Sequence, residues 1–153
     1  MDFDTLKLIL VPTDFSEPSE AVRRAAVRLA QTFHAAIEFF HVDIDPTLVL
    51  PPPLDAISMP RRFERALGDT AEQLARIVEE TRTTGVPCTS TEEVGRSHTA
   101  IVERARAAGV GLIVMGSHGR RGLSHLLLGS VAEKVVEHAR CPVLVVPAPS
   151  PGA

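Results

Sequence analysis

Four glycines and two arginines lie in the segment 114–134, "VMGSHGRRGLSHLLLGSVAEK", between an apolar run and a predicted helix. Glycines at 116, 119 and 129 would let backbone N–H groups approach an anion closely and would allow conformations closed to other residues. Arg120 and Arg121 could add charge-assisted contacts. The segment is therefore a candidate phosphate cradle, although a flexible surface connection would have a similar composition.

The end of this segment offers a second feature suited to phosphate. Ser130 begins the predicted helix, and a helix N-terminus has unpaired N–H donors and a partial positive charge. Gly129, Ser130 and Val131 are thus expected to hold phosphate. Ser130 and Glu133 also fit a capping box, which would explain the serine without any ligand.

The predicted strands and helices determine where this candidate phosphate-binding segment lies in the fold. Short apolar runs alternate with stretches of helical periodicity throughout the chain. Strands are expected at 6–11, 36–42, 88–94, 111–115 and 142–146, and helices after Ser16, over about 60–83, from Ser97 and over about 130–139. Ser16 is the expected N-cap of the first helix, and Gly85 and Gly109 are expected to end the second and third.

Such alternation indicates an α/β fold with a parallel sheet covered by helices on both faces. In the common five-strand order 3-2-1-4-5, ligands bind beyond the carboxyl ends of strands one and four, where the connections diverge. Unusual residues follow those strands: Pro12, Thr13 and Asp14 after the first, and 115–119 after the fourth. The neighbouring second strand ends in His41, Val42 and Asp43, and His41 is expected to be a structural residue beside the pocket.

Composition narrows the classes of function. The net charge of −3 and the 4% aromatic content argue against a nucleic-acid partner. The absence of a signal-peptide pattern and of a long apolar run predicts a cytoplasmic protein without membrane partners. Cys88 and Cys141 have no metal-ligand spacing and are expected to be small buried side chains. The length suits one domain, assigned to 1–148 with a frayed tail at 149–153, and a Pro-rich loop at 46–60 interrupts it.

Two familiar nucleotide motifs are absent, the Gly-x-x-x-x-Gly-Lys-Ser/Thr loop and a Gly-x-Gly-x-x-Gly after the first strand. The chain nevertheless resembles the ATP-binding branch of the universal stress protein family. The resemblance runs from "VPTDFS" through "HV" and "GLIVMGSHGRRG" to "LLGSVAEKVVEHARCPVLVV". The signature of that branch is glycine, two residues, glycine, nine residues, glycine and then serine or threonine, and the chain matches it in full at Gly116, Gly119, Gly129 and Ser130.

The resemblance implies a Rossmann-like three-layer fold, a homodimer joined through the last strand and ATP, ADP or AMP at the switch point. Mg²⁺ or Mn²⁺ accompanying the phosphates would be compatible with this site. The nucleotide-binding residues carried over by position, together with neighbours in the loop, are Pro12, Thr13, Asp14, Val42, Met115, Gly116, Ser117, His118, Gly119, Arg120, Gly129, Ser130 and Val131. The expected dimer strand contains Val143, Leu144, Val145 and Val146, whose apolar faces at a sheet edge would otherwise be exposed.

Three functions are compatible with this site. The first is a nucleotide-dependent stress-response or regulatory protein read by an unknown protein partner. The second is a slow ATPase or phosphotransferase, in which Asp14 would help hold a metal and His118 or His125 would polarise water. No spacing identifies a dedicated base, so binding is favoured over turnover. The third is an adaptor without nucleotide, which the intact glycine signature disfavours.

Overall fold

The fold was analysed in a computed structural model of the chain, which describes residues 6–44, 58–117 and 128–147. For Glu17 and for residues 58–67 it describes the backbone only. Strands and helices alternate along these ranges, as the sequence predicts. The elements are β1 (Leu8–Pro12), α1 (Glu17–Phe33), β2 (Ala36–Ile44), α2 (Ser58–Arg82), β3 (Cys88–Gly95), α3 (Ser97–Ala107), β4 (Leu112–Gly116), α4 (Ser130–His138) and β5 (Val143–Val146).

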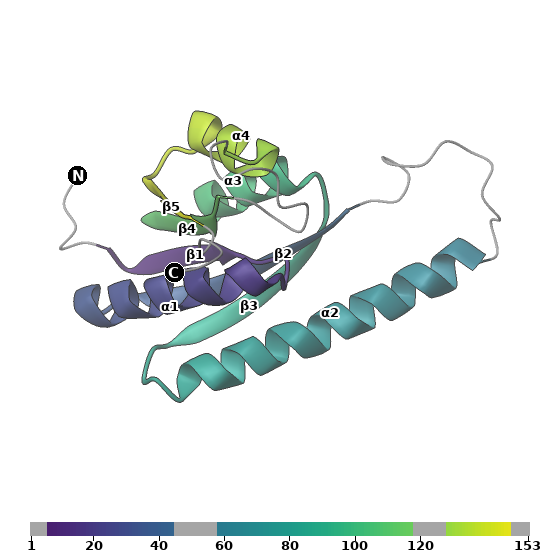
Figure 1. Cartoon of the computed structure of the whole chain (residues 1–153), viewed down its shortest axis with the longest axis horizontal. Helices are drawn as coiled ribbons and strands as arrows, with labels where there is room; N and C mark the ends of the chain where they lie inside the picture. Colours follow the sequence, from purple (N-terminus) through teal and green to yellow (C-terminus); the bar gives the residue numbers. More distant parts are fainter. Residues whose placement is uncertain (1–5, 45–57, 118–127, 148–153) are drawn as a thin grey trace, which may run out of the picture.

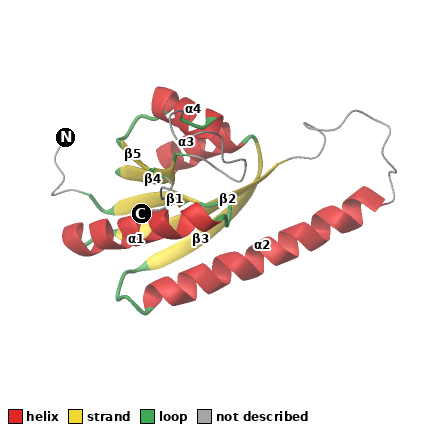
Figure 2. Cartoon of the chain, viewed as in Figure 1, coloured by secondary structure: helices red, strands yellow, loops and turns green. Residues whose placement is uncertain are grey.

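The strands form one parallel sheet in the order β3-β2-β1-β4-β5 (Figure 2). This confirms the predicted order, with β3 and β5 at the two edges. Because β1 lies between β2 and β4, the connections leaving β1 and β4 diverge at the centre of the sheet. The switch point predicted from the sequence is therefore present.

Helices cover both faces of the sheet, with α1 and α2 below it and α3 and α4 above it in Figure 1. The alternation of side chains along each strand divides the core accordingly. Ile9 and Val11 pack in the cluster under α1 and α2, whereas Leu10 packs in the cluster under α3 and α4. Phe39 and Phe40 divide in the same way, and both are fully buried.

Several element boundaries differ from the prediction by one or two residues. Pro12 is the last residue of β1 and does not lie beyond it. A proline is tolerated there because its missing N–H falls at the end of the ladder. Parallel pairing of β2 with β3 continues to Ile44 and Gly95, so both strands run past the apolar residues that predicted them.

The helix ends follow local chemistry. Ser16 is the N-cap of α1, as predicted, but no side-chain cap bond is made, because its Oγ is hydrogen-bonded to Asp14. His34 ends α1 in the left-handed region at φ 53°. Gly85 and Gly109 have φ values of 82° and 64°, which explains why glycine follows α2 and α3.

One buried ion pair ties α3 to the sheet. Glu38 on β2 is 3% exposed, and its Oε1 accepts hydrogen bonds from Arg104 Nε at 3.0 Å and from Thr91 Oγ1 at 2.6 Å. The side chain of Arg104 is 31% exposed. The Glu38 carboxylate is thus buried, whereas the Arg104 guanidinium reaches water. Removing Arg104 should therefore destabilise the fold more than removing Glu38.

The two cysteines lie on opposite faces of the sheet. Cys88 is buried in the cluster under α1 and α2, and its Sγ donates a hydrogen bond to the Val78 carbonyl at 3.3 Å. Cys141 packs against the cluster under α3 and α4 and is only partly buried. The prediction that both cysteines are buried is therefore correct for Cys88 and wrong for Cys141. Burial raises the pKa of both thiols.

Candidate functional site

The carboxyl end of β4 and the start of α4 are hydrogen-bonded to each other. The Gly129 amide donates to the Ser117 carbonyl at 2.7 Å, and the Ser117 amide donates to the Val146 carbonyl at 2.9 Å. These bonds bring together the two ends of the glycine-rich segment, with Gly116 and Ser117 on one side and Gly129 and Ser130 on the other. Four of the predicted site residues therefore meet at the switch point.

The first turn of α4 leaves amide donors without a partner inside the helix. Its first hydrogen bond runs from the Glu133 amide to the Gly129 carbonyl at 2.9 Å. The amides of Ser130 and Val131 precede that bond, and α4 directs its positive dipole end toward them. Ser130 is the first helical residue, and the N-cap is Gly129, so the alternative Ser130–Glu133 capping box is wrong.

The glycines at this junction do not need unusual backbone angles. Gly129 has φ −65° and ψ 152°, and Gly116 is the last residue of an extended strand. The expectation that these two positions adopt conformations closed to other residues is therefore wrong. The property that remains is the lack of a side chain, which leaves the backbone amides of this junction open to close approach.

Apolar residues from three elements line the side of this junction that faces α3 and α4. Met115 is buried in that cluster, and Val42 and Val131 are partly buried against it. The sequence predicts these three residues as part of the same site, and the fold places them in one cluster.

The loop after β1 is held by its own side chains. The Thr13 amide donates to the Phe40 carbonyl at 2.9 Å, and Thr13 Oγ1 accepts from the Phe15 amide at 3.2 Å. Asp14 Oδ1 accepts from the Ser16 amide at 3.0 Å and from Ser19 Oγ at 2.9 Å. The Asp14 carboxylate therefore fixes the path of the chain from β1 into α1.

A titratable cluster lies next to this loop on the face of α1 and α2. The buried His41 places Nδ1 2.7 Å from the Thr13 carbonyl oxygen and Nε2 3.5 Å from Asp43 Oδ1. Burial raises the pKa of Glu92 to about 7, and a hydrogen bond and charge repulsion from Asp43 add to this effect. His41 thus adjoins the predicted pocket, as expected, but the two carboxyls beside it were not predicted.

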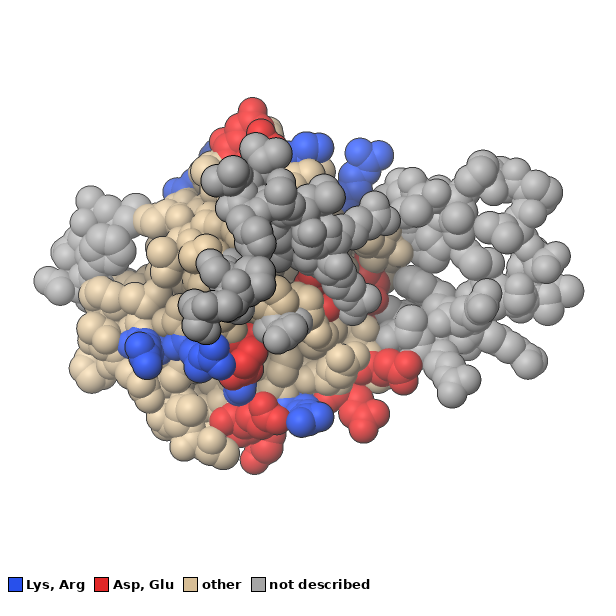
Figure 3. Space-filling model, viewed as in Figure 1, with Lys and Arg blue, Asp and Glu red and all other residues tan. Residues whose placement is uncertain are grey.

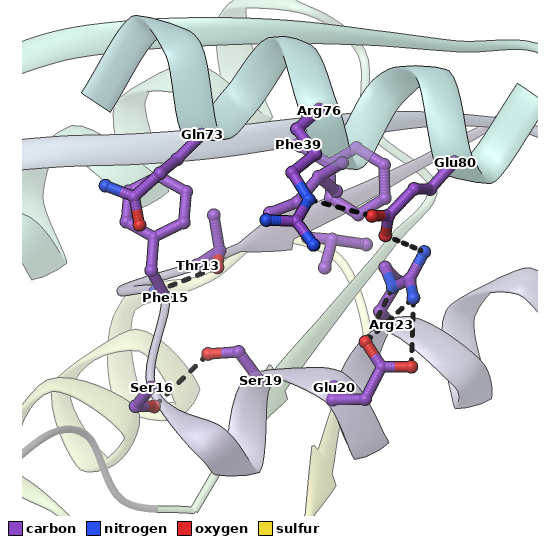
Figure 4. A pocket seen from close by; sticks show the side chains of 12 residues that line it. Thr13, Phe15, Ser16, Ser19, Glu20, Arg23, Phe39, Gln73, Arg76 and Glu80 are labelled. Atoms are coloured by element: carbon purple, nitrogen blue, oxygen red, sulfur yellow. Dashed lines mark hydrogen bonds and ion pairs between the residues drawn. The ribbon is translucent and has the colours of Figure 1, made fainter. Parts of the chain in front are cut away.

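A pocket of about 220 Å³ lies between α1 and α2 (Figure 4). An ion-pair chain crosses it: Arg23 contacts Glu20 at 2.8 Å and Glu80 at 3.4 Å, and Arg76 contacts Glu80 at 3.0 Å. Charges of both signs are accordingly interspersed over these helices in Figure 3. Of the predicted site residues that the structure describes, Thr13 is the one that lines this pocket, and no described residue of the β4–α4 junction does.

Three of the predicted site residues, His118, Gly119 and Arg120, lie outside the described residues. Across 6–44, 58–117 and 128–147, no group of three His, Cys, Asp or Glu side chains is placed to hold a metal ion. Within the same ranges, no helix is both long and apolar enough to cross a membrane. Phe15 and Glu92 were not among the predicted site residues. The β2–β3 register pairs Glu92 with His41, and the sequence pattern does not determine that register.

A five-stranded parallel sheet in the order β3-β2-β1-β4-β5 with helices on both faces defines a doubly wound, Rossmann-like α/β protein. The chain belongs to the universal stress protein family, whose sequence profile matches residues 5–147. Universal stress protein MJ0531 of Methanocaldococcus jannaschii is 36% identical over 144 residues, which cover 94% of this chain and 83% of that protein.

Solved structures share the fold. The structure of MJ0577, a universal stress protein of the same organism, is 30% identical, covers 95% of this chain and 99% of its own, and superposes with a TM-score of 0.83. The universal stress protein from Archaeoglobus fulgidus in complex with dAMP is 22% identical, with coverage of 91% and 96% and a TM-score of 0.66.

Proposed function

We propose that this chain binds an adenine nucleotide at the switch point between β1 and β4, and that it acts as a nucleotide-dependent stress-response regulator. One observation carries the proposal: the hydrogen bond from the Gly129 amide to the Ser117 carbonyl, which holds the amides of α4 beside the end of β4. The dAMP complex of a protein with the same fold supports the choice of adenine nucleotide.

The division of the site into two parts supports a particular orientation of the ligand. The phosphates would accept hydrogen bonds from the amides of Ser130 and Val131, and the adenine would lie against Val42 and Met115. Pro12, Thr13 and Asp14 would border the adenosine. The number of phosphates is left to the titration, because the amides of Ser117 and Gly129 already donate within the junction and the donors left for the ligand lie at the start of α4. Any Mg²⁺ or Mn²⁺ would take oxygens from the phosphates.

The hydrogen bonds that Asp14 already makes favour nucleotide binding over nucleotide hydrolysis. Its Oδ1 already accepts hydrogen bonds from the Ser16 amide and from Ser19 Oγ, so this oxygen holds the loop together. In the hydrolysis alternative Asp14 would help to hold a metal ion beside the phosphates. An oxygen that already accepts two hydrogen bonds from its own loop is less available to a metal ion.

The first experiment asks which nucleotide the protein carries. The purified protein is denatured, the released small molecule is identified by mass spectrometry, and the emptied protein is titrated with ATP and ADP. Recovered or saturable adenine nucleotide is expected. If neither route detects one, the proposed function fails and the nucleotide-free adaptor becomes the better description.

Gly129→Val is expected to weaken ATP binding at least tenfold in titration calorimetry, which is about 1.4 kcal/mol. The backbone angles of Gly129 suit any residue, so valine adds bulk in front of the amides without straining the chain. Gly68→Val is the matched control, because a Cβ at that position of α2 meets nothing within 4 Å. Equal affinity of both variants would remove α4 from the site.

We further propose that the protein is a cytoplasmic homodimer joined through β5. Among the described residues, no strand pairs with the outer edge of β5, and Leu144 is 40% exposed. Val143 packs against the cluster under α3 and α4, and Val146 against the cluster under α1 and α2, so both faces of β5 are apolar.

Leu144→Glu is expected to give a monomer in sedimentation velocity, because a charge would be buried at the joined edge. Val94→Glu is the matched control, since Val94 is 49% exposed on β3, the other edge strand. A dimer that survives the first change and dissociates with the second would place the interface at β3.

A further inference from the structure

His41 connects β2 to the loop that follows β1. It is 8% exposed, and its Nδ1 lies 2.7 Å from the Thr13 carbonyl oxygen. A carbonyl oxygen can only accept a hydrogen bond, so Nδ1 must carry the hydrogen. The protonation of this nitrogen is therefore fixed by its partner, whatever the charge of the ring.

The other ring nitrogen faces a carboxyl group. Nε2 lies 3.5 Å from Asp43 Oδ1, within ion-pair distance. A neutral ring with hydrogen on Nδ1 would present the lone pair of Nε2 to this oxygen, which is repulsive unless a proton lies between them. Asp43 and Glu92 each also have a buried oxygen without a hydrogen-bond partner, Oδ2 and Oε1 respectively. The Thr13 carbonyl on one side and Asp43 on the other thus hold the His41 ring in one orientation.

The same ring supports a residue in an unusual conformation. The ring of Phe15 lies 4.7 Å from that of His41 between centroids, with 30° between their planes. Phe15 has φ 58°, in the left-handed region that residues with a side chain rarely adopt. Such a conformation persists only where the surroundings hold it. His41 contacts the residues on both sides of Asp14, Thr13 through its carbonyl and Phe15 through its ring.

We propose that His41 is a positioning residue for the nucleotide site, which fixes the Thr13–Phe15 loop in the conformation that receives the adenosine. The proposal rests on the proposed function. His41 itself lies on the α1 and α2 side of β2, as shown by its contact with Phe15, whereas Val42 and Met115 lie on the α3 and α4 side. It therefore acts through the backbone of the loop and not by touching the nucleotide.

Three substitutions separate this role from simple packing. His41→Asn keeps an N–H donor close to the place of Nδ1, whereas His41→Gln moves the donor outward and His41→Leu removes it. With ATP titrated at one fixed pH, His41→Asn is expected to bind within about threefold of the unsubstituted protein. The Gln and Leu variants are expected to bind at least tenfold more weakly, which is about 1.4 kcal/mol.

Thermal unfolding of each variant and binding by the unsubstituted protein decide between the outcomes. If the unsubstituted protein does not bind any adenine nucleotide, the proposed function fails. If it binds, and folded His41→Leu binds within threefold of it, or the Asn variant loses as much affinity as the Leu variant, the positioning role is overturned.

A measurement on the unsubstituted protein covers the case in which the variants do not fold. Nitrogen-15 NMR of labelled histidine is expected to show hydrogen on Nδ1 of His41, and a change in its ring signals when ATP is added. A ring with hydrogen on Nε2 alone would contradict the bond to Thr13 and overturn the proposal. Ring signals that stay unchanged on ATP binding would overturn it as well.

Discussion

Arg104→Met is expected to lower the free energy of unfolding by about 3–5 kcal/mol, because it leaves the Glu38 carboxylate buried without its cation. Glu38 is 3% exposed, and Thr91 Oγ1 would be its remaining described donor. Burying an unpaired charge is costly, whereas an arginine that loses its carboxylate can be hydrated from the exposed side. Urea denaturation followed by circular dichroism measures the change.

Two further variants test the cause of that loss. Glu38→Leu in the Arg104→Met background is expected to recover most of the lost stability, because no buried charge then remains. Arg23→Met is the matched control: Arg23 also pairs with glutamates, but Glu20 and Glu80 are about half exposed, at 46% and 45% of their side chains. It should cost less than about 1 kcal/mol. A similar loss from both arginine variants would show that burial of Glu38 is not the cause.

Glu92→Gln is expected to stabilise the protein by at most about 3.5 kcal/mol at pH 8 and by less than about 1 kcal/mol at pH 5. The pKa of Glu92 is raised from 4.5 to about 7 by burial and by Asp43, so the folded protein holds a proton that the unfolded chain releases. Between these values the folded state binds more protons, so its stability falls as the pH rises and the loss is complete above pH 7. The upper bound is the size of that shift at about 1.4 kcal/mol per pKa unit.

The measurement is the difference in free energy of unfolding between the variant and the unsubstituted protein from pH 5 to pH 8. Taking this difference removes the contributions of the titrating groups that do not interact with Glu92, so what remains belongs to Glu92 and Asp43 together. Glu93→Gln is the matched control, because Glu93 is the exposed neighbour of Glu92 on the same strand. A difference that does not change with pH for Glu92→Gln would show that this carboxyl is already ionised at pH 5.

The fold was predictable because its signals are local and repeated. Apolar strands such as 111–115 contrast with amphipathic helices, and Gly85 and Gly109 fall at the positive φ angles that end α2 and α3. The weak strand at 88–94 was correctly expected near an edge. Boundaries were less predictable, because pairing with β2 extends β3 to Gly95 regardless of its polar sequence.

The candidate site was predictable where it depends on position at strand ends. Gly116, Ser117, Gly129 and Ser130 meet because a parallel sheet brings such ends to one edge, and the Gly129–Ser117 bond completes the junction. The φ of 58° at Phe15 could not be predicted, because no sequence rule favours phenylalanine in that region. The Asp43–Glu92 contact depends on strand register, which alternation of apolar residues leaves undetermined.

The placement of the two sulfur atoms bears on how this protein would behave under oxidative stress. Peroxide reacts with the thiolate form of cysteine, and burial disfavours that form at both Cys88 and Cys141. The Cys88 thiol also has a hydrogen-bond acceptor in the Val78 carbonyl, and the sheet separates it from Cys141. An internal disulfide would require crossing the sheet. The sequence distance between the two thiols is thus matched by a separation across the sheet, so this fold provides no pair of cysteines that could record oxidation as an internal disulfide.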